Sequence, residues 1–282
     1  MNNPNPIKVI LWTLRRKEND VVNLYDYLAG VMQASTGGNF LNFGYWEENT
    51  SSPLEAQENL CHMAGKMAEL DKTEFVLDVG SGFSEPSFLW KKDYPGIEIT
   101  CININKNQLV EANKNQKSYK INLVNSTATK IPIASSTHDR IIALESAQHF
   151  KPLDDFISES NRILKKEGIM VIAIPILTRP SKVGIMQTGI LQFTWSSEHY
   201  SLDIIKETIQ EHDLEIMEIK MIGSKVYVPL ADYYIKNRIN LREKILDRYP
   251  SYVESILFKS MMKMKQAAND KIIEYALIKC KK

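Results

Sequence analysis

Residues 76–88, VLDVGSGFSEPSF, join a buried strand, a glycine turn and the start of a helix in thirteen consecutive residues. The first four are mostly apolar and β-branched, which is typical of a central parallel strand. Gly80 and Gly82 permit a turn that a Cβ atom would hinder, and Ser84 and Pro86 favour a helix N-terminus. A strand, a glycine turn and a helix in this order predict a nucleotide-type cofactor site.

The residue that follows this turn helps to choose the cofactor. A dinucleotide fingerprint would place a small residue at position 85, where helix and strand pack beside a pyrophosphate. The chain has Glu85 there, and its carboxylate would repel a phosphate anion. The G-x-x-x-x-G-K-[ST] run of ATP and GTP loops is also missing from the sequence. An NAD-type ligand is therefore disfavoured, whereas a sulfonium cofactor meets no such objection.

Four stretches carry a resemblance to a known family. They are NFGYWEENT from Asn42, LDVGSGFSEPS from Leu77, ITCININKNQLVEAN from Ile99, and IPIASSTHDRIIALESAQHF from Ile131. From Asp78 through Phe150 the chain resembles the class I S-adenosylmethionine-dependent methyltransferases, most closely the small-molecule branch that includes sugar, sterol, tocopherol and polyketide methyltransferases. The resemblance implies S-adenosylmethionine as cofactor and S-adenosylhomocysteine as product. It also implies an α/β, Rossmann-like fold with a mostly parallel seven-stranded sheet, an antiparallel last strand and an added helical cap.

Alternating strand and helix patterns agree with such a fold. We predict strands at 75–79, 98–103, 139–144, 169–174, 215–221 and 272–280, and helices at 7–28, 52–70, 87–92, 107–115, 153–164 and 203–212. Ser52 is the expected N-cap of its helix, and Gly168 is expected to end the helix at 153–164 as a left-handed cap.

The chain divides into four expected parts. Residues 1–70 carry N-terminal helices and a cofactor-covering loop, 71–222 form the Rossmann-like core, 223–270 form a helical insertion, and 271–282 return as the last strand of the core. We interpret the insertion as a substrate cap. A surface or dimer element is an equally good reading, which leaves a homodimer open.

Charge balance and cysteine spacing limit the kinds of partner that the chain is expected to bind. The 282 residues hold 35 basic and 34 acidic side chains, so no overall charge favours nucleic acid or an anionic membrane. Cys61, Cys101 and Cys280 are scattered without metal-ligand spacing, and no window is long enough to span a bilayer. The apolar run IKVILWTL lacks the features of a signal peptide. We expect a cytoplasmic enzyme with a small-molecule acceptor, no metal and no stable membrane insertion.

The resemblance assigns cofactor contacts to positions in these motifs. Asp78 would hold the methionine ammonium or order its water, although a capping aspartate is the alternative role. Asn103 stands where many relatives place an acid for the ribose hydroxyls, and its amide could accept from one hydroxyl and donate to the other. The complete set of expected cofactor residues is Tyr45, Trp46, Asp78, Gly80, Ser81, Gly82, Asn103, Ile104, Gln108, Thr127, Ala128 and Glu145.

The residues assigned to the adenine ring depart from the family pattern, whereas the assigned aromatic pair follows it. Thr127 and Ala128 occupy the positions that flank the adenine ring, where relatives carry an aspartate that accepts from the exocyclic amine. Thr127 could accept that hydrogen bond only through its hydroxyl. Tyr45 and Trp46 correspond to an aromatic segment that folds over the cofactor, where a π face beside a sulfonium is favourable. A hydrophobic plug between helix and sheet is the alternative for both aromatic residues.

His149 lies where relatives with oxygen nucleophiles place a general base. Several sugar-methylating relatives support that histidine with an acid on the next strand, but this chain has Ile174 there. His149 is therefore expected to act as base with an unassigned partner, or to orient the substrate. His199, with Trp195 and Tyr200, could line an acceptor pocket. Surface or capping roles are expected for the remaining histidines, which are His62, His138 and His212.

The leading hypothesis is methylation of a hydroxyl oxygen on a natural-product, sugar or lipid-like acceptor, with C- and N-methylation left open. The unusual residues Ser84, Asn103 and Thr127 motivate an alternative, a protein of this fold that binds the cofactor without methylating, as a cyclase, rearrangement catalyst or binding partner. A third reading makes the segment FKSMMKMKQ an amphipathic face for lipid-like acceptors or membranes.

Overall fold

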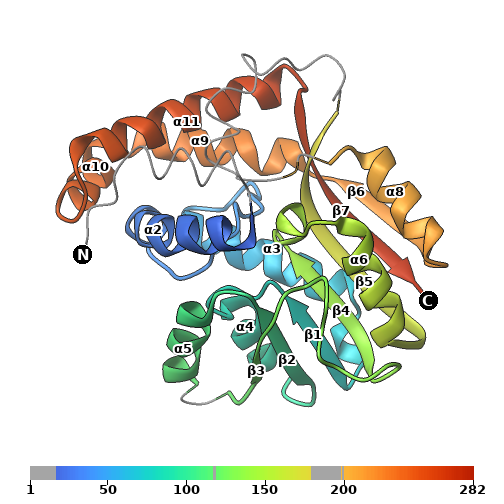
Figure 1. The fold of residues 1–282 in the computed structure, drawn as a ribbon. Helices are drawn as coiled ribbons and strands as arrows, with labels where there is room; N and C mark the ends of the chain where they lie inside the picture. Colours follow the sequence, from blue (N-terminus) through green and yellow to red (C-terminus); the bar gives the residue numbers. More distant parts are fainter. Residues whose placement is uncertain (1–16, 117–118, 179–197, 199) are drawn as a thin grey trace.

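The computed structural model describes residues 17–116, 119–178, 198 and 200–282 (Figure 1). Its centre is a sheet of seven strands in the order β3-β2-β1-β4-β5-β7-β6. The first five strands are parallel, and β7 runs antiparallel to both β5 and β6. The strands are β1 Phe75–Val79, β2 Glu98–Asn103, β3 Asn122–Asn125, β4 His138–Leu144, β5 Leu164–Leu177, β6 Glu215–Met221 and β7 Ile273–Lys281. This confirms the expected mostly parallel sheet with an antiparallel last strand.

Helices cover the two faces of the sheet through separate apolar cores. One core joins Leu60 of α3 and Trp90 of α4 to β-strand residues such as Val76, while the other joins Phe156 of α6 and Ile209 of α8 to the opposite sheet face. All five side chains are fully buried. The helices are α2 Glu18–Thr36, α3 Pro53–Met67, α4 Glu85–Asp93, α5 Lys106–Asn115, α6 Leu153–Ile163, α8 Leu202–Glu211, α9 Tyr227–Lys236, α10 Arg238–Leu246 and α11 Ser251–Asn269.

Helices α9, α10 and α11 form a layer of their own, and α2 lies between this layer and the edge of the sheet (Figure 1). A small apolar cluster around Tyr234 and Leu241 holds the layer together. Within it, Arg238 donates to the buried Glu254 at 2.8 Å and also covers the ring of Phe258. The segment that the sequence marks as an insertion is therefore helical and packs over the N-terminal helix.

Several local expectations are confirmed. The predicted ranges of β1, β2 and β6 agree with the structure residue for residue, and those of the other expected strands overlap it. Ser52 caps α3, because its Oγ accepts from the backbone N–H of Glu55. Of the predicted helix at 7–28, residues 7–16 lie outside the described residues, and α2 extends beyond it to Thr36.

Three local expectations are wrong or incomplete. Strand β3 was not predicted, because its four residues are too few and too polar at their ends to give a pattern. Gly168 does not cap a helix, since α6 ends at Ile163 and the chain passes directly into β5. The residue with a left-handed backbone conformation is Glu167, not Gly168. Glycine is needed at position 168 because a Cβ there would lie 2.8 Å from the carbonyl oxygen of Lys165. Ser84 precedes α4, but its hydroxyl contacts Ser81 instead of capping the helix.

No helix in the described part of the chain has the length and apolar character needed to cross a bilayer.

Candidate active site

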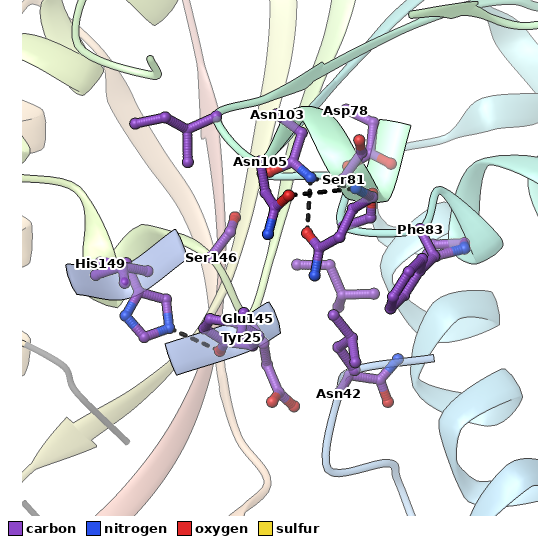
Figure 2. Close-up of a pocket in the computed structure, with 18 of the residues that line it drawn as sticks. Tyr25, Asn42, Asp78, Ser81, Phe83, Asn103, Asn105, Glu145, Ser146 and His149 are labelled. Carbon is purple, nitrogen blue, oxygen red and sulfur yellow. Dashed lines mark hydrogen bonds between the residues drawn. The ribbon is translucent and has the colours of Figure 1, made fainter. Parts of the chain in front are cut away.

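The main cavity opens where β1, β2 and β4 end (Figure 2). It begins at the turn after β1, where Gly80 and Gly82 both have positive φ, at 78° and 57°. The Gly80 N–H donates to the carbonyl of Ile102 on β2 at 2.8 Å, which fixes the turn against the sheet. A Cβ on Gly80 would lie 2.3 Å from the Cβ of Ser146, so the turn requires glycine for conformation and for space.

Asp78 is buried at the floor of this cavity. Ser87 of α4 donates to its Oδ2 at 2.6 Å. Burial raises the pKa of the Asp78 carboxyl to about 7, and the Ser87 hydrogen bond only partly offsets this. A cationic group would stabilise the ionised carboxylate, as the ammonium of a methionine moiety does. A capping aspartate accepts a hydrogen bond from a backbone N–H at the start of a helix. Asp78 accepts from the Ser87 side chain instead, which argues against the capping role.

Asn103 and Gln108 form a hydrogen-bonded pair beside the glycine turn. The Asn103 Nδ2 donates both to the carbonyl of Gly82, at 3.1 Å, and to the Oε1 of Gln108, at 2.9 Å. This uses the donors of Asn103 and leaves its oxygen to accept. The buried Nε2 of Gln108 has no hydrogen-bond partner among the described residues. The expectation that Asn103 alone serves both ribose hydroxyls is therefore corrected: Asn103 can accept, and Gln108 can donate.

A second, smaller cavity continues from the first and shares Gly80, Asn103, Ile104 and His149 with it. Apolar side chains form part of its wall, as a stacked aromatic base requires. The expected residues Ile104, Thr127 and Ala128 all line it, together with Glu18, Val21, Ile102, Ser126, Thr129 and Phe150. Thr127 and Ala128 therefore lie together with Ile104, whereas Gln108 lines the main cavity.

Glu145 lies at the end of β4 in a left-handed conformation, with φ at 49°. Its Oε1 accepts from the backbone N–H of Phe43 at 2.8 Å and from the hydroxyl of Tyr275 at 3.0 Å. Burial raises the pKa of the Glu145 carboxyl to about 8, against the lowering effect of these two hydrogen bonds. Glu145 lines the cavity and also ties the loop before α3 to β7.

The structure corrects the assignment of Tyr45 and Trp46, because neither lines these two cavities. The Trp46 ring lies against Tyr233 of α9, with ring centroids 5.6 Å apart, and Tyr45 packs on the core. This is the plug that the sequence offered as the alternative. Residues of the preceding loop take their place at the cavity, namely Asn39, Leu41 and Asn42.

His149 lies on the one-turn helix Ala147–His149 and faces the cavity. Its Nε2 is 2.9 Å from the hydroxyl of Tyr25 on α2, and the rings meet edge to face (Figure 2). Burial raises the pKa of the Tyr25 phenol above its ordinary range, and the nearby Glu145 carboxylate adds to the shift. Ile174 is fully buried in the core, so the family's acid position is structural in this chain.

Helix α2 supplies further site residues that the sequence analysis missed. Asp26 accepts from Asn105 at 2.7 Å and from Asn107 at 3.1 Å, and Glu18 accepts from Thr127 at 2.5 Å. The contacts of Asp26 join α2 to the start of α5, and the contact of Glu18 joins it to the loop after β3. No local motif announces such residues, because their partners lie 79 to 109 positions away in the chain.

The other histidines lie away from these two cavities as far as the structure describes them. His62 pairs with Asp93 and His212 with Asp154, while His138 contacts Thr137. His199 and Trp195 lie outside the described residues, and Tyr200 donates to the carbonyl of Phe150. In the part of the chain that is described, no cluster of three or more His, Cys, Asp or Glu side chains could hold a metal ion.

The residues present fit an adenosyl cofactor with an amino-acid tail. A glycine turn that a Cβ would fill, a buried carboxyl for an ammonium, a free amide donor beside Asn103 and an apolar slot follow one another along one continuous wall. Figure 2 shows Asp78, Ser81 and Asn103 at one end of the main cavity and Tyr25, Glu145 and His149 at another.

Comparisons with known proteins agree with this reading. The family model described as a methyltransferase domain matches residues 77–172. The chain is 25% identical to the erythromycin 3''-O-methyltransferase of Saccharopolyspora erythraea over 244 residues, which cover 80% of this chain and 78% of that protein. Two solved structures share the fold. The [4+2]-cyclase SpnF has a TM-score of 0.77 at 20% identity, over 94% of this chain and 96% of that one. The cyclopropane synthase MmaA2 from Mycobacterium tuberculosis has a TM-score of 0.80 at 14% identity, over 92% and 95%.

The glycine turn, the strand order and these similarities lead to one assignment. The domain match over residues 77–172, the strand order and the small-molecule relatives together support a class I methyltransferase of the small-molecule branch, an enzyme whose cofactor is S-adenosylmethionine.

Proposed function

We propose that this enzyme methylates a hydroxyl oxygen of a small, largely apolar organic acceptor. The observation that carries the proposal is His149, a histidine that lines the cofactor cavity with its Nε2 hydrogen-bonded to Tyr25. A hydroxyl is a poor nucleophile until a base takes its proton, whereas an amine needs no such help at high pH. The 3''-O-methyltransferase similarity supports the same bond type.

The cofactor supplies an electrophilic methyl group on a sulfonium, and the chain supplies position, dryness and a proton acceptor. The raised pKa keeps the Tyr25 phenol protonated, so it donates to Nε2 and marks that nitrogen as the basic one. An acceptor hydroxyl that reaches the Tyr25 oxygen passes its proton to this oxygen while Tyr25 passes its own to Nε2. The proton ends on Nε2 of His149, and the acceptor oxygen is left as the nucleophile.

Helix α2 closes the cleft over these residues. Its hydrogen bonds to His149, Asn105 and Thr127 anchor two separate turns of the helix to the core. Closure excludes water, which strengthens each electrostatic interaction inside and protects the reactive cofactor from hydrolysis.

We propose that the insertion at 223–270 is the acceptor cap. A pocket between α2 and the cap is lined mainly by apolar side chains, including Met32, Leu230 and Met261, and it shares Asn42 with the main cavity. The buried carbonyl oxygens of Asn42 and Gln57 lack hydrogen-bond partners among the described residues, and both residues line this pocket. An apolar molecule with a hydroxyl or N–H donor would satisfy them.

Transfer of a labelled methyl group tests the proposal. The purified enzyme is incubated with S-adenosylmethionine labelled in the methyl group and with a macrolide glycoside, a sterol and a phenol as separate acceptors. We expect a labelled methyl ether in at least one reaction, identified by mass spectrometry. His149→Ala should lower kcat by at least about 100-fold with little change in S-adenosylhomocysteine affinity. His62→Ala is the matched control, because His62 lies on the surface away from the cavity.

Three results would contradict these proposals. Label on carbon or nitrogen would move the reaction to another bond type. Tight cofactor binding without transfer to any acceptor would favour the alternative of a protein that binds the cofactor without methylating, and a dimer that buries the 223–270 face would favour an assembly role for the insertion.

A further inference from the structure

The adenine end of the cofactor site lacks the acid that the family resemblance leads one to expect. The chain carries Thr127 at that position, in a slot walled by the apolar side chains of Ile102, Ile104 and Ala128. The exocyclic amine of adenine needs a hydrogen-bond acceptor at this edge, and a carboxylate accepts more strongly than a hydroxyl. The question is which group of this chain accepts from the amine.

The Thr127 hydroxyl is already fully engaged by its neighbours. It donates its one proton to the Oε1 of Glu18 at 2.5 Å. Since that proton is committed, the Thr129 hydroxyl at 3.0 Å must donate to Thr127, and the backbone N–H of Thr129 donates to the same oxygen at 3.3 Å. One proton and two lone pairs are all that a hydroxyl offers. Thr127 therefore has no lone pair left for adenine.

Glu18 is the remaining candidate for the group that accepts from the exocyclic amine. It lines the same cavity, and its carboxylate has two oxygens with about four acceptor sites, of which Thr127 uses one. The contact with Thr127 also restricts where the carboxylate can point. Glu18 reaches this edge from α2, a helix held down independently by Tyr25 on His149 and by Asp26 on Asn105.

We infer that Glu18 accepts the hydrogen bond from the exocyclic amine of adenine. A residue of α2 then supplies the acceptor that relatives place on the loop at position 127. Thr127 acts as the positioning residue that holds the carboxylate in place. The adenine site is then complete only when α2 is docked on the core, which couples recognition of the cofactor to closure of the cleft. This inference rests on the cofactor assignment and is independent of the atom that is methylated.

Calorimetric titration with two ligands tests the inference without any acceptor or turnover. S-adenosylhomocysteine presents an amine at the adenine edge, whereas S-inosylhomocysteine presents a carbonyl oxygen at the same position. A carboxylate accepts from the first and repels the second, so the wild-type protein should bind the adenosyl form at least about 10-fold more tightly. Glu18→Gln can turn its amide to donate, and it should reduce this preference to within about 3-fold or reverse it.

The control variant is Glu111→Gln, which removes an exposed carboxylate of α5 that pairs with Lys114 and lies outside both cavities. It should keep the wild-type preference. Equal weakening of both ligands in Glu18→Gln would show that Glu18 only supports α2, and it would overturn the inference. A wild-type protein that does not distinguish the two ligands would overturn it as well. Failure of the wild-type protein to bind either ligand would refute the cofactor assignment itself, and the inference with it.

Discussion

The two halves of the cleft are built in different ways. The cofactor half stands on the ends of β1, β2 and β4, and its turn is fixed by backbone hydrogen bonds such as that from Gly80 to Ile102. The other half, which we propose binds the acceptor, is covered by α2, whose contacts with the core at this site are side-chain hydrogen bonds such as that between Tyr25 and His149. We call the first half, held by backbone pairing, the rigid half, and the second half, held by side-chain contacts of α2, the closing half.

Charge follows the same division. Asp78 and Glu145 of the rigid half have buried carboxyls, and burial raises their pKa values to about 7 and about 8. The acids that α2 brings to the rim, Glu18 and Asp26, are exposed and bond to neutral side chains. In the rigid half, burial therefore disfavours the ionised form of both carboxyls, and a cationic ligand would stabilise that form. The closing half contributes contacts that form only when α2 packs on the core.

The largest effect is expected from a substitution that disturbs the rigid half alone. Gly80→Ala places a Cβ 2.3 Å from Ser146 at a φ of 78°, so the turn must move. We expect S-adenosylhomocysteine affinity to fall by about 100-fold or more in calorimetry, because overpacking at such a site costs about 1–3 kcal/mol in addition to backbone strain. Gly37→Ala is the control, with a φ of 86° but no atom within 4 Å of the added Cβ. It should lower Tm slightly and leave affinity unchanged. Wild-type affinity in Gly80→Ala would show that the turn does not hold the cofactor.

A smaller effect should separate the closing half from the rigid one. Tyr25→Phe removes the hydroxyl that donates to His149 and keeps the ring in place. We expect kcat to fall about 10-fold, the worth of one hydrogen bond to a group that becomes charged, with S-adenosylhomocysteine affinity within about 2-fold of wild type. Tyr27→Phe on the same helix is the matched control, because Tyr27 lies outside the cavity and contacts Tyr249. If affinity falls as far as kcat, Tyr25 belongs to the cofactor site and the division made above is wrong.

A third effect, of about the same size as the second, is a pH dependence of ligand binding in the rigid half. The pKa of Asp78 is raised from its ordinary value of 3.8 to about 7, so its contribution to stability is fully present below about pH 4 and is lost as pH rises through 7. A cationic ligand needs the ionised form, which rises from about one tenth at pH 6 to about nine tenths at pH 8. Affinity for S-adenosylhomocysteine should therefore increase about 10-fold over this interval, and Asp78→Asn should bind weakly with a flat profile. Asp155→Asn, an exposed acid on α6, should keep the wild-type slope. A flat wild-type profile would mean that Asp78 is already ionised or does not face the ligand.

The sequence by itself predicted six of the seven strands and the glycine turn of the cofactor half. Strands β1 and β2 consist mostly of apolar and β-branched residues, and the glycine turn follows β1 directly in the chain, so local information is sufficient there. It did not determine β3, whose four residues become a strand through pairing with β2, or the role of Gly168, which depends on the approach of Leu164 and Lys165.

Only the tertiary structure decided which residues close the site. Tyr25 meets His149 across 124 positions and Glu18 meets Thr127 across 109, and no periodicity or spacing encodes such pairs. Tyr45 and Trp46 were assigned by motif to the cofactor, but the packing of α9 draws Trp46 to Tyr233 and leaves the cavity to the residues before it. The physical reason is the same in each case. Strand ends are placed by backbone pairing that a short sequence specifies, whereas the partner of a helix face is set by how distant segments pack.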